Sequence, residues 1–190
     1  MTWLWLLLLG AVLGLFSLPY QALSSLGLIL QNDLWLSSDS ISPVAIALVF
    51  VSSLALVLLA WGPLQRARGG GLTPVIALQD NVFGQQASLL KQLSLQTQLK
   101  RLPLMVLTHL GGLTVGIESP SASLGASLLL AIRMRWPQFI PLAALPLPML
   151  CAIGGGAGLG VAFRSPLLGL TYAIEELGRS SGRSLVLPVL

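Results

Sequence analysis

Charged side chains are scarce in this chain of 190 residues. Asp, Glu, Lys and Arg make up 8% of it, against about 25% in an ordinary soluble domain. None occurs within residues 1–32, 40–65, 102–117 or 136–163. Because a helix needs roughly 20 mostly apolar residues to cross the hydrocarbon core of a bilayer, several of these intervals are long enough to span it. The composition excludes a soluble enzyme, a nucleic-acid-binding domain and a disordered tail, and it predicts an integral membrane protein.

Cysteine and histidine occur once each, as Cys151 and His109. A single cysteine excludes an intramolecular disulfide and a Cys-rich metal site, and a lone thiol in an apolar stretch is typical of plain packing. We expect His109, on an apolar helix, to be packed and hydrogen-bonded. His109 is also the sole base available to Ser121 or Ser123, and no nucleophile loop is recognisable, which disfavours an intramembrane serine protease. We therefore expect no enzyme activity, no metal and no cofactor.

The net charge of +4 is best interpreted as a topology signal, because the basic residues lie between apolar segments and form no nucleic-acid-binding face. The connection between the first two apolar segments holds only Asp33 and Asp39. The connection after the second segment is basic, with Arg66, Arg68, Lys91, Lys100 and Arg101. The positive-inside rule then predicts that residues 65–101 and Met1 are cytoplasmic, and that the Asp33–Asp39 loop lies outside.

The apolar pattern predicts an all-α fold. The expected helices cover residues 2–31, 43–63, 102–115, 120–132 and 166–177, with a short apolar piece at 75–78, a further apolar segment at 147–153, and an amphipathic surface stretch at 80–100. Gly10 and Gly14 have the spacing that lets another helix approach closely, although small residues equally suit a curved helix.

Glycine and proline interrupt the chain at residues 69–74, 116–120 and 154–160. Irregular backbone at membrane depth is tolerated where it lines a cavity, and the broken helices of transporters direct their termini at bound ions. The run at 154–160 lacks the Gly-x-Gly-x-x-Gly spacing, which excludes a dinucleotide fold and favours close helix packing. These interruptions are the main indication of an ion-conducting protein.

The segment Gly116-Ile117-Glu118-Ser119-Pro120 predicts a helix start that can bind an anion. Ser119 suits the N-cap and Pro120 the first helical position. Such an end offers unpaired N–H groups and a partial positive charge. Glu118 is isolated among uncharged residues, and a carboxylate there can occupy the anion site until it is protonated or displaced. The alternative is a carboxylate that only caps the helix.

A second acidic pair, Glu175-Glu176, ends the last predicted helix. Two carboxylates at a helix C-terminus oppose the macrodipole unless they are solvated or functional. Neutralisation by Arg179 and Arg183 is the simpler explanation, and both remain open at this point.

Together these motifs resemble the CLC family of chloride channels and proton/chloride exchangers. Residues 116–120 resemble the Gly-Arg/Lys-Glu-Gly-Pro signature. Residues 156–169 resemble the family's glycine-rich stretch GAAAGLAAAFNAPLAG, and residues 173–177 its IEE segment. Residues 69–73 look like a degenerate form of the GSGIP anion loop. Order and spacing agree over roughly residues 45–180.

The resemblance implies roles for individual residues. Glu118 falls on the gating glutamate and external proton acceptor, and Glu176 on the internal proton-transfer glutamate that exchangers keep. Ile117 and Ser119 would contribute backbone N–H groups to the outer anion site. Gly70 falls on the serine that touches the central anion, beside Gly71. The missing hydroxyl at Gly70 leaves the choice of anion open.

The resemblance covers the first of two inverted repeats, so it implies a single transmembrane domain over residues 1–190 that is the N-terminal half of a subunit, with about eight helices of uneven length. The implied function is transport of chloride or a similar anion coupled to protons, in the cell membrane. A passive voltage-gated channel and a non-transporting half-subunit are the alternatives. The implied partners are the bilayer and a second copy or a complementary C-terminal half.

Overall fold

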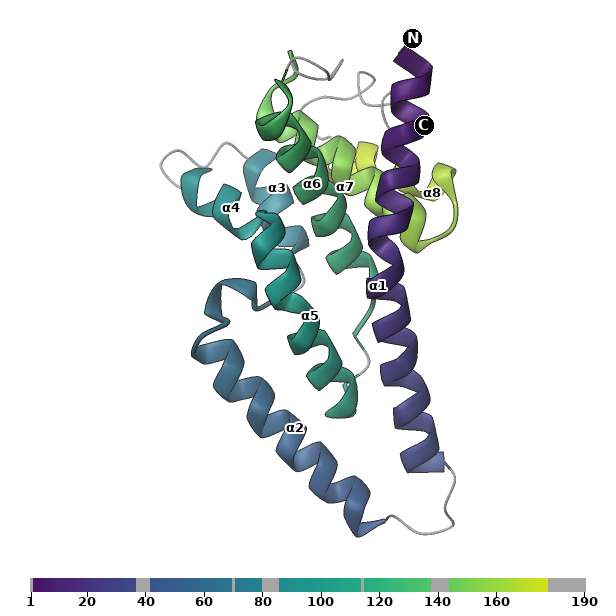
Figure 1. Cartoon of the computed structure of the whole chain (residues 1–190), viewed down its shortest axis with the longest axis vertical. Helices are drawn as coiled ribbons and strands as arrows, with labels where there is room; N and C mark the ends of the chain where they lie inside the picture. Colours follow the sequence, from purple (N-terminus) through teal and green to yellow (C-terminus); the bar gives the residue numbers. More distant parts are fainter. Residues whose placement is uncertain are drawn as a thin grey trace.

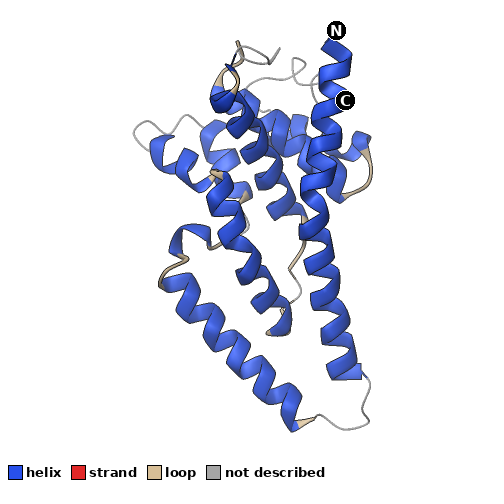
Figure 2. Cartoon of the chain, in the orientation of Figure 1, coloured by secondary structure: helices blue, strands red, loops and turns tan. Residues whose placement is uncertain are grey.

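The computed structural model describes residues 2–36, 42–69, 71–79, 86–113, 115–137 and 144–177. All regular structure in these ranges is helical (Figure 2). The α-helices are α1 (Thr2–Leu36), α2 (Pro43–Trp61), α3 (Leu72–Gln79), α4 (Gln86–Gln92), α5 (Leu95–Leu110), α6 (Glu118–Arg135), α7 (Leu147–Ala162) and α8 (Pro166–Tyr172). A 3-10 turn, η1 (Gln65–Ala67), follows α2, and a π-helical turn, η3 (Ala173–Leu177), follows α8. The predicted all-α fold is confirmed.

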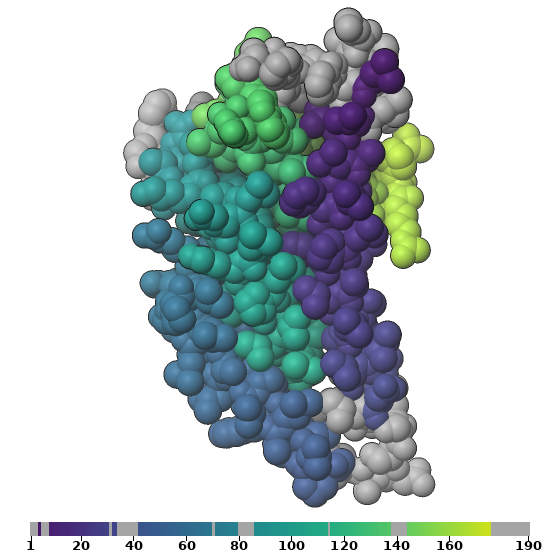
Figure 3. Space-filling model, viewed as in Figure 1, coloured from purple at the N-terminus to yellow at the C-terminus, as the bar shows by residue number. Residues whose placement is uncertain are grey.

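Two helices are long and apolar enough to cross a membrane, over Leu8–Leu30 and Pro43–Trp61. Helix α1 continues beyond its predicted end at residue 31, with Pro19 inside it. Helix α2 begins where Ser42 accepts a hydrogen bond from the Val44 N–H and Pro43 takes the first position. Large apolar side chains on α2, such as Phe50 and Trp61, are exposed. Figures 1 and 3 show α2 as an arm at the lower edge of the molecule, with most of its surface uncovered.

Helices α6 and α7 form the densest contact of the fold (Figure 1). A Cβ on Gly125 would overlap the carbonyl oxygen of Gly154, and a Cβ on Gly158 would overlap that of Ser121. Glycine therefore allows the two backbones to touch. The predicted break at residues 154–160 is wrong, because α7 runs through them without interruption. The prediction of close packing at these glycines is confirmed.

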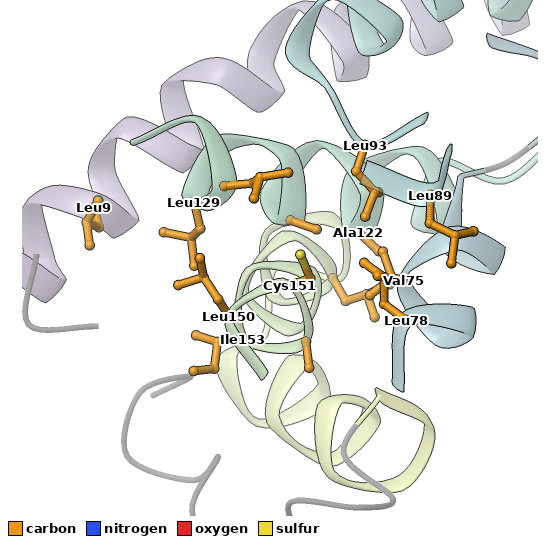
Figure 4. Packing of buried hydrophobic residues seen from close by; sticks show 14 residues of the cluster. Leu9, Val75, Leu78, Leu89, Leu93, Ala122, Leu129, Leu150, Cys151 and Ile153 are labelled. Carbon is orange, nitrogen blue, oxygen red and sulfur yellow. The ribbon is translucent and has the colours of Figure 1, made fainter. Parts of the chain in front are cut away.

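The main apolar cluster gathers side chains from α1, α3, α4, α6 and α7. Figure 4 shows Val75 and Leu78 of α3 facing Ala122 of α6 and Cys151 of α7. Cys151 is fully buried in this cluster, which confirms its predicted role in packing. The cluster fixes α3 against the α6–α7 pair.

Helix α5 packs between α1 and α2, and His109 lies at its contact with α1. The His109 Nδ1 lies 2.8 Å from the Met105 carbonyl oxygen, and its Nε2 lies 3.4 Å from the Ser24 hydroxyl. Gly27 of α1 packs directly against the imidazole ring. The prediction of a packed, hydrogen-bonded histidine is confirmed. Nothing lies within 4 Å of a Cβ built on Gly10 or Gly14, so no described helix uses that pair.

Candidate anion site

The N-terminal ends of α3 and α6 meet, although 47 residues separate the two contacting positions. The Leu72 N–H donates to the Ser119 hydroxyl at 3.1 Å. Two segments that the sequence predicts to bind an anion, at residues 69–73 and 116–120, are thereby brought together. The bond also restrains the first turn of one helix relative to the other.

The predicted capping role of Ser119 is wrong. Helix α6 begins at Glu118, the N-cap position is Ile117, and no side chain caps it. Ser119 therefore lies inside the first turn, and its hydroxyl accepts from α3 rather than from its own helix. Ile117 is half-buried, and its carbonyl oxygen accepts from the Ser121 N–H at 2.9 Å.

In the segment that resembles an anion loop, the structure describes Gly69 and Gly71. Gly70 lies outside the described residues. Gly71 is buried and has φ +89°. A Cβ at this position would overlap the Arg101 guanidinium and the Ser123 hydroxyl. Because a side chain is excluded by both backbone conformation and space, Gly71 allows Arg101 to approach the loop directly.

Arg101 is a candidate site residue that the sequence does not reveal. Its side chain is 3% exposed, whereas the sequence predicts a place in the cytoplasmic basic connection. The guanidinium donates to the Ala67 carbonyl oxygen at 3.2 Å, to the Ser123 hydroxyl at 3.0 Å and to the Gln98 amide oxygen. These partners are neutral, so a positive charge remains beside Gly71.

Arg101 lies on the buried stripe of α5, which no apolar pattern in the sequence marks. The buried positions of this helix recur on one stripe, at Thr97, Gln98, Arg101, Leu104, Met105 and His109. This period places Arg101 on the core face. The sequence places Arg101 and Lys100 in one basic connection, but Lys100 is exposed and Arg101 is buried, because they lie on different faces of α5.

Glu118 is the first residue of α6, whereas the sequence predicts a helix that begins at Pro120, and its side chain is exposed. The carboxylate turns toward Gly116, where a Cβ would overlap one of its oxygens. One turn further, the Ser121 hydroxyl is buried and has no hydrogen-bond partner among the described residues. The start of α6 therefore combines an exposed carboxylate with a buried hydroxyl that has no hydrogen-bond partner among the described residues.

The Glu175-Glu176 pair lies in the π-helical turn η3, which contacts α3 and α7. Glu175 is exposed, and the Glu176 side chain is outside the described part of the structure. The segment of the predicted internal proton acceptor thus adjoins the helix that carries the anion loop. No three His, Cys, Asp or Glu side chains of the described residues gather as metal ligands.

These features define a helical membrane protein in which two helix N-termini and a buried arginine surround a glycine loop. Residues 65–190 match the family described as voltage gated chloride channel. The chain belongs to this family, so it is an integral membrane protein of a class that transports chloride. No curated protein and no solved structure matches the chain.

Proposed function

We propose that this chain carries chloride, or a similar small anion, in exchange for protons through the junction of α3 and α6. The observation that supports the proposal is the hydrogen bond between the Leu72 N–H and the Ser119 hydroxyl, which joins the two anion-directed segments. Both helices begin at this junction, so their positive dipole ends lie close together. In this proposal the protein acts in the cell membrane.

The charge at the junction favours an anion. Unpaired N–H groups at helix starts bind anions without a basic side chain. Arg101 adds a full positive charge beside Gly71, and its described hydrogen-bond partners carry none that would cancel it. A desolvated anion needs ligands on all sides, because the cost of removing its water is tens of kcal/mol. We propose that a second repeat, from a complementary half or a second copy, supplies the opposite side.

Glu118 is proposed as the gate. An ionised carboxylate at the start of α6 competes with the anion for the same N–H groups, whereas a protonated one does not. Glu118→Gln is expected to behave as permanently protonated, so anion flux persists and proton coupling is lost. The measurement is simultaneous chloride and proton flux in liposomes holding the chain assembled with a family second-repeat half. Glu175→Gln is the matched control, and proton-coupled flux that survives in Glu118→Gln would remove Glu118 from the mechanism.

Glu176 is proposed as the internal proton acceptor. Apolar protein offers a proton no path without a relay group, so Glu176→Val is expected to retain passive chloride movement and to lose proton delivery from the cytoplasmic side. The same liposomes, with a proton gradient imposed in each direction, measure this. Glu175→Val tests whether the adjacent glutamate relays protons instead. Proton pumping by Glu176→Val would assign the relay to another residue.

A passive voltage-gated channel is the second candidate, because the family description names channels. Chloride movement with no accompanying protons in the unsubstituted protein would establish the channel and exclude exchange. Absence of any chloride movement in the assembled protein would instead favour a non-transporting half-subunit.

A further inference from the structure

A polar cavity of about 490 Å³ lies between the end of α2, the turn η1 and the start of α5. It does not include the junction of α3 and α6. Its size falls within the range of roughly 300–1,000 Å³ that is usual for small-molecule sites. Three basic side chains line it, from three separate segments: Arg66, Lys91 and Lys100. None of its described lining residues is acidic.

Hydrogen bonds fix the segments that carry these cations. The Thr97 hydroxyl donates to the Lys91 carbonyl oxygen at 2.9 Å, and the Thr97 N–H donates to the Ser94 hydroxyl at 3.3 Å. These bonds lock the turn between α4 and α5. The Arg101 Nε donates to the Ala67 carbonyl oxygen at 3.2 Å, which ties η1 to α5. Three like charges are therefore held around one space by the fold, an arrangement that an anion stabilises.

The cavity lies where a membrane-spanning helix ends. Trp61 is the last residue of α2, is 70% exposed, and has the Arg68 guanidinium 4.5 Å from its ring centroid. An exposed tryptophan beside a stacked arginine at a helix end is typical of headgroup depth in a bilayer. Basic pockets at that depth, between membrane helices, bind anionic lipid headgroups.

We propose that this cavity binds the phosphate of an anionic phospholipid headgroup. A lipid headgroup and free inorganic phosphate both present a phosphate anion, so either could in principle occupy the cavity. The position beside Trp61 favours the lipid, because a lipid is present at that depth at high local concentration and an acyl chain has the exposed apolar surface of α2 beside it. The proposal does not depend on anion transport.

The test is lipid binding to the purified 190-residue chain in neutral detergent, measured by native mass spectrometry. Phosphatidylglycerol is titrated against phosphatidylcholine, and inorganic phosphate is added in a separate arm. The unsubstituted chain is expected to retain phosphatidylglycerol over phosphatidylcholine. Loss of two cations in K91Q/K100Q is expected to weaken phosphatidylglycerol binding roughly 10- to 30-fold.

Arg135→Gln is the matched control, because Arg135 is exposed and does not line the cavity. It is expected to leave lipid retention unchanged. Lys91 and Lys100 are exposed, so their replacement should not disturb folding, and Arg66→Gln provides an independent variant with the same expected direction. Equal loss in Arg135→Gln, equal retention of the two lipids, or displacement of the lipid by equimolar inorganic phosphate would overturn the proposal.

Discussion

Gly71 and Arg101 show how one residue type makes room for another. Gly71 has a left-handed backbone, and the space that its Cβ would need is filled by the Arg101 guanidinium and the Ser123 hydroxyl. The resemblance of residues 69–73 to an anion loop predicts a glycine-rich turn, but nothing in the local sequence indicates which distant side chain packs against it. That partner comes from α5, and it depends on how α5 and α6 cross.

Arg101 supplies the first residue-scale prediction. Arg101→Met removes three hydrogen bonds to Ala67, Gln98 and Ser123 and leaves buried polar atoms unsatisfied. We expect a loss of about 1–3 kcal/mol in the free energy of unfolding. Arg101→Lys should lose less, because an ammonium keeps the charge but lacks the guanidinium fork that reaches several acceptors.

Denaturant unfolding of the purified chain in detergent, followed by circular dichroism, measures the Arg101 variants. Arg135→Met is the control, since it removes an exposed arginine from the end of α6. Equal stability of Arg101→Met and Arg135→Met would mean that the buried hydrogen bonds contribute nothing net.

At the scale of elements, helix periodicity predicted most of the fold. Helices α2 and α8 each begin at a Ser-Pro pair, in which serine caps the helix and proline takes the first position. The sequence-based predictions are wrong where tertiary packing outweighs the conformational preference of the local sequence. The run at residues 154–160 stays helical within α7 because contacts with α6 offset the low helix propensity of its glycines. Ser119 does not cap α6 because the Leu72 N–H takes its hydroxyl.

The contact between α6 and α7 gives a prediction at this scale. Gly158→Val places a branched side chain against the Ser121 carbonyl oxygen and the Ala122 Cα. The helices must separate, and we expect a cost of about 1–3 kcal/mol or more in the free energy of unfolding. Separation would also shift the start of α6 relative to α3.

Gly10→Val is the matched control, because a Cβ at Gly10 meets nothing within 4 Å. Both variants are compared by denaturant unfolding in the same detergent. A Gly158→Val chain as stable as Gly10→Val would show that α6 and α7 are not held in backbone contact.

At the scale of the whole molecule, the apolar composition and family motifs predicted the class of protein, and the family match over residues 65–190 confirms it. The geometry of the candidate site was only partly predictable. The sequence indicated both segments that meet at the junction, since each has a glycine-containing turn before a helix. It did not indicate that a buried arginine lies beside them, because burial is decided by the packing of α5.

In the proposed site, the described residues offer N–H groups to an anion from one side, at the starts of α3 and α6. A helix dipole contributes about 0.3–2 kcal/mol and each charge-assisted hydrogen bond about 1.5–3 kcal/mol. Together, two helix dipoles and a few hydrogen bonds contribute less than the tens of kcal/mol needed to strip an anion of water in a low-dielectric medium. A complete anion site of this kind therefore requires ligands from a second repeat.

The most direct test of the central claim is chloride efflux from liposomes that hold either the purified chain alone or the chain assembled with a family second-repeat half. The account predicts efflux only from the assembled protein, with coupled proton movement that disappears in Glu118→Gln. Empty liposomes and the isolated second-repeat half are the controls. Glu118-dependent efflux from the chain alone, or no efflux from an assembly shown to have formed, would contradict the account.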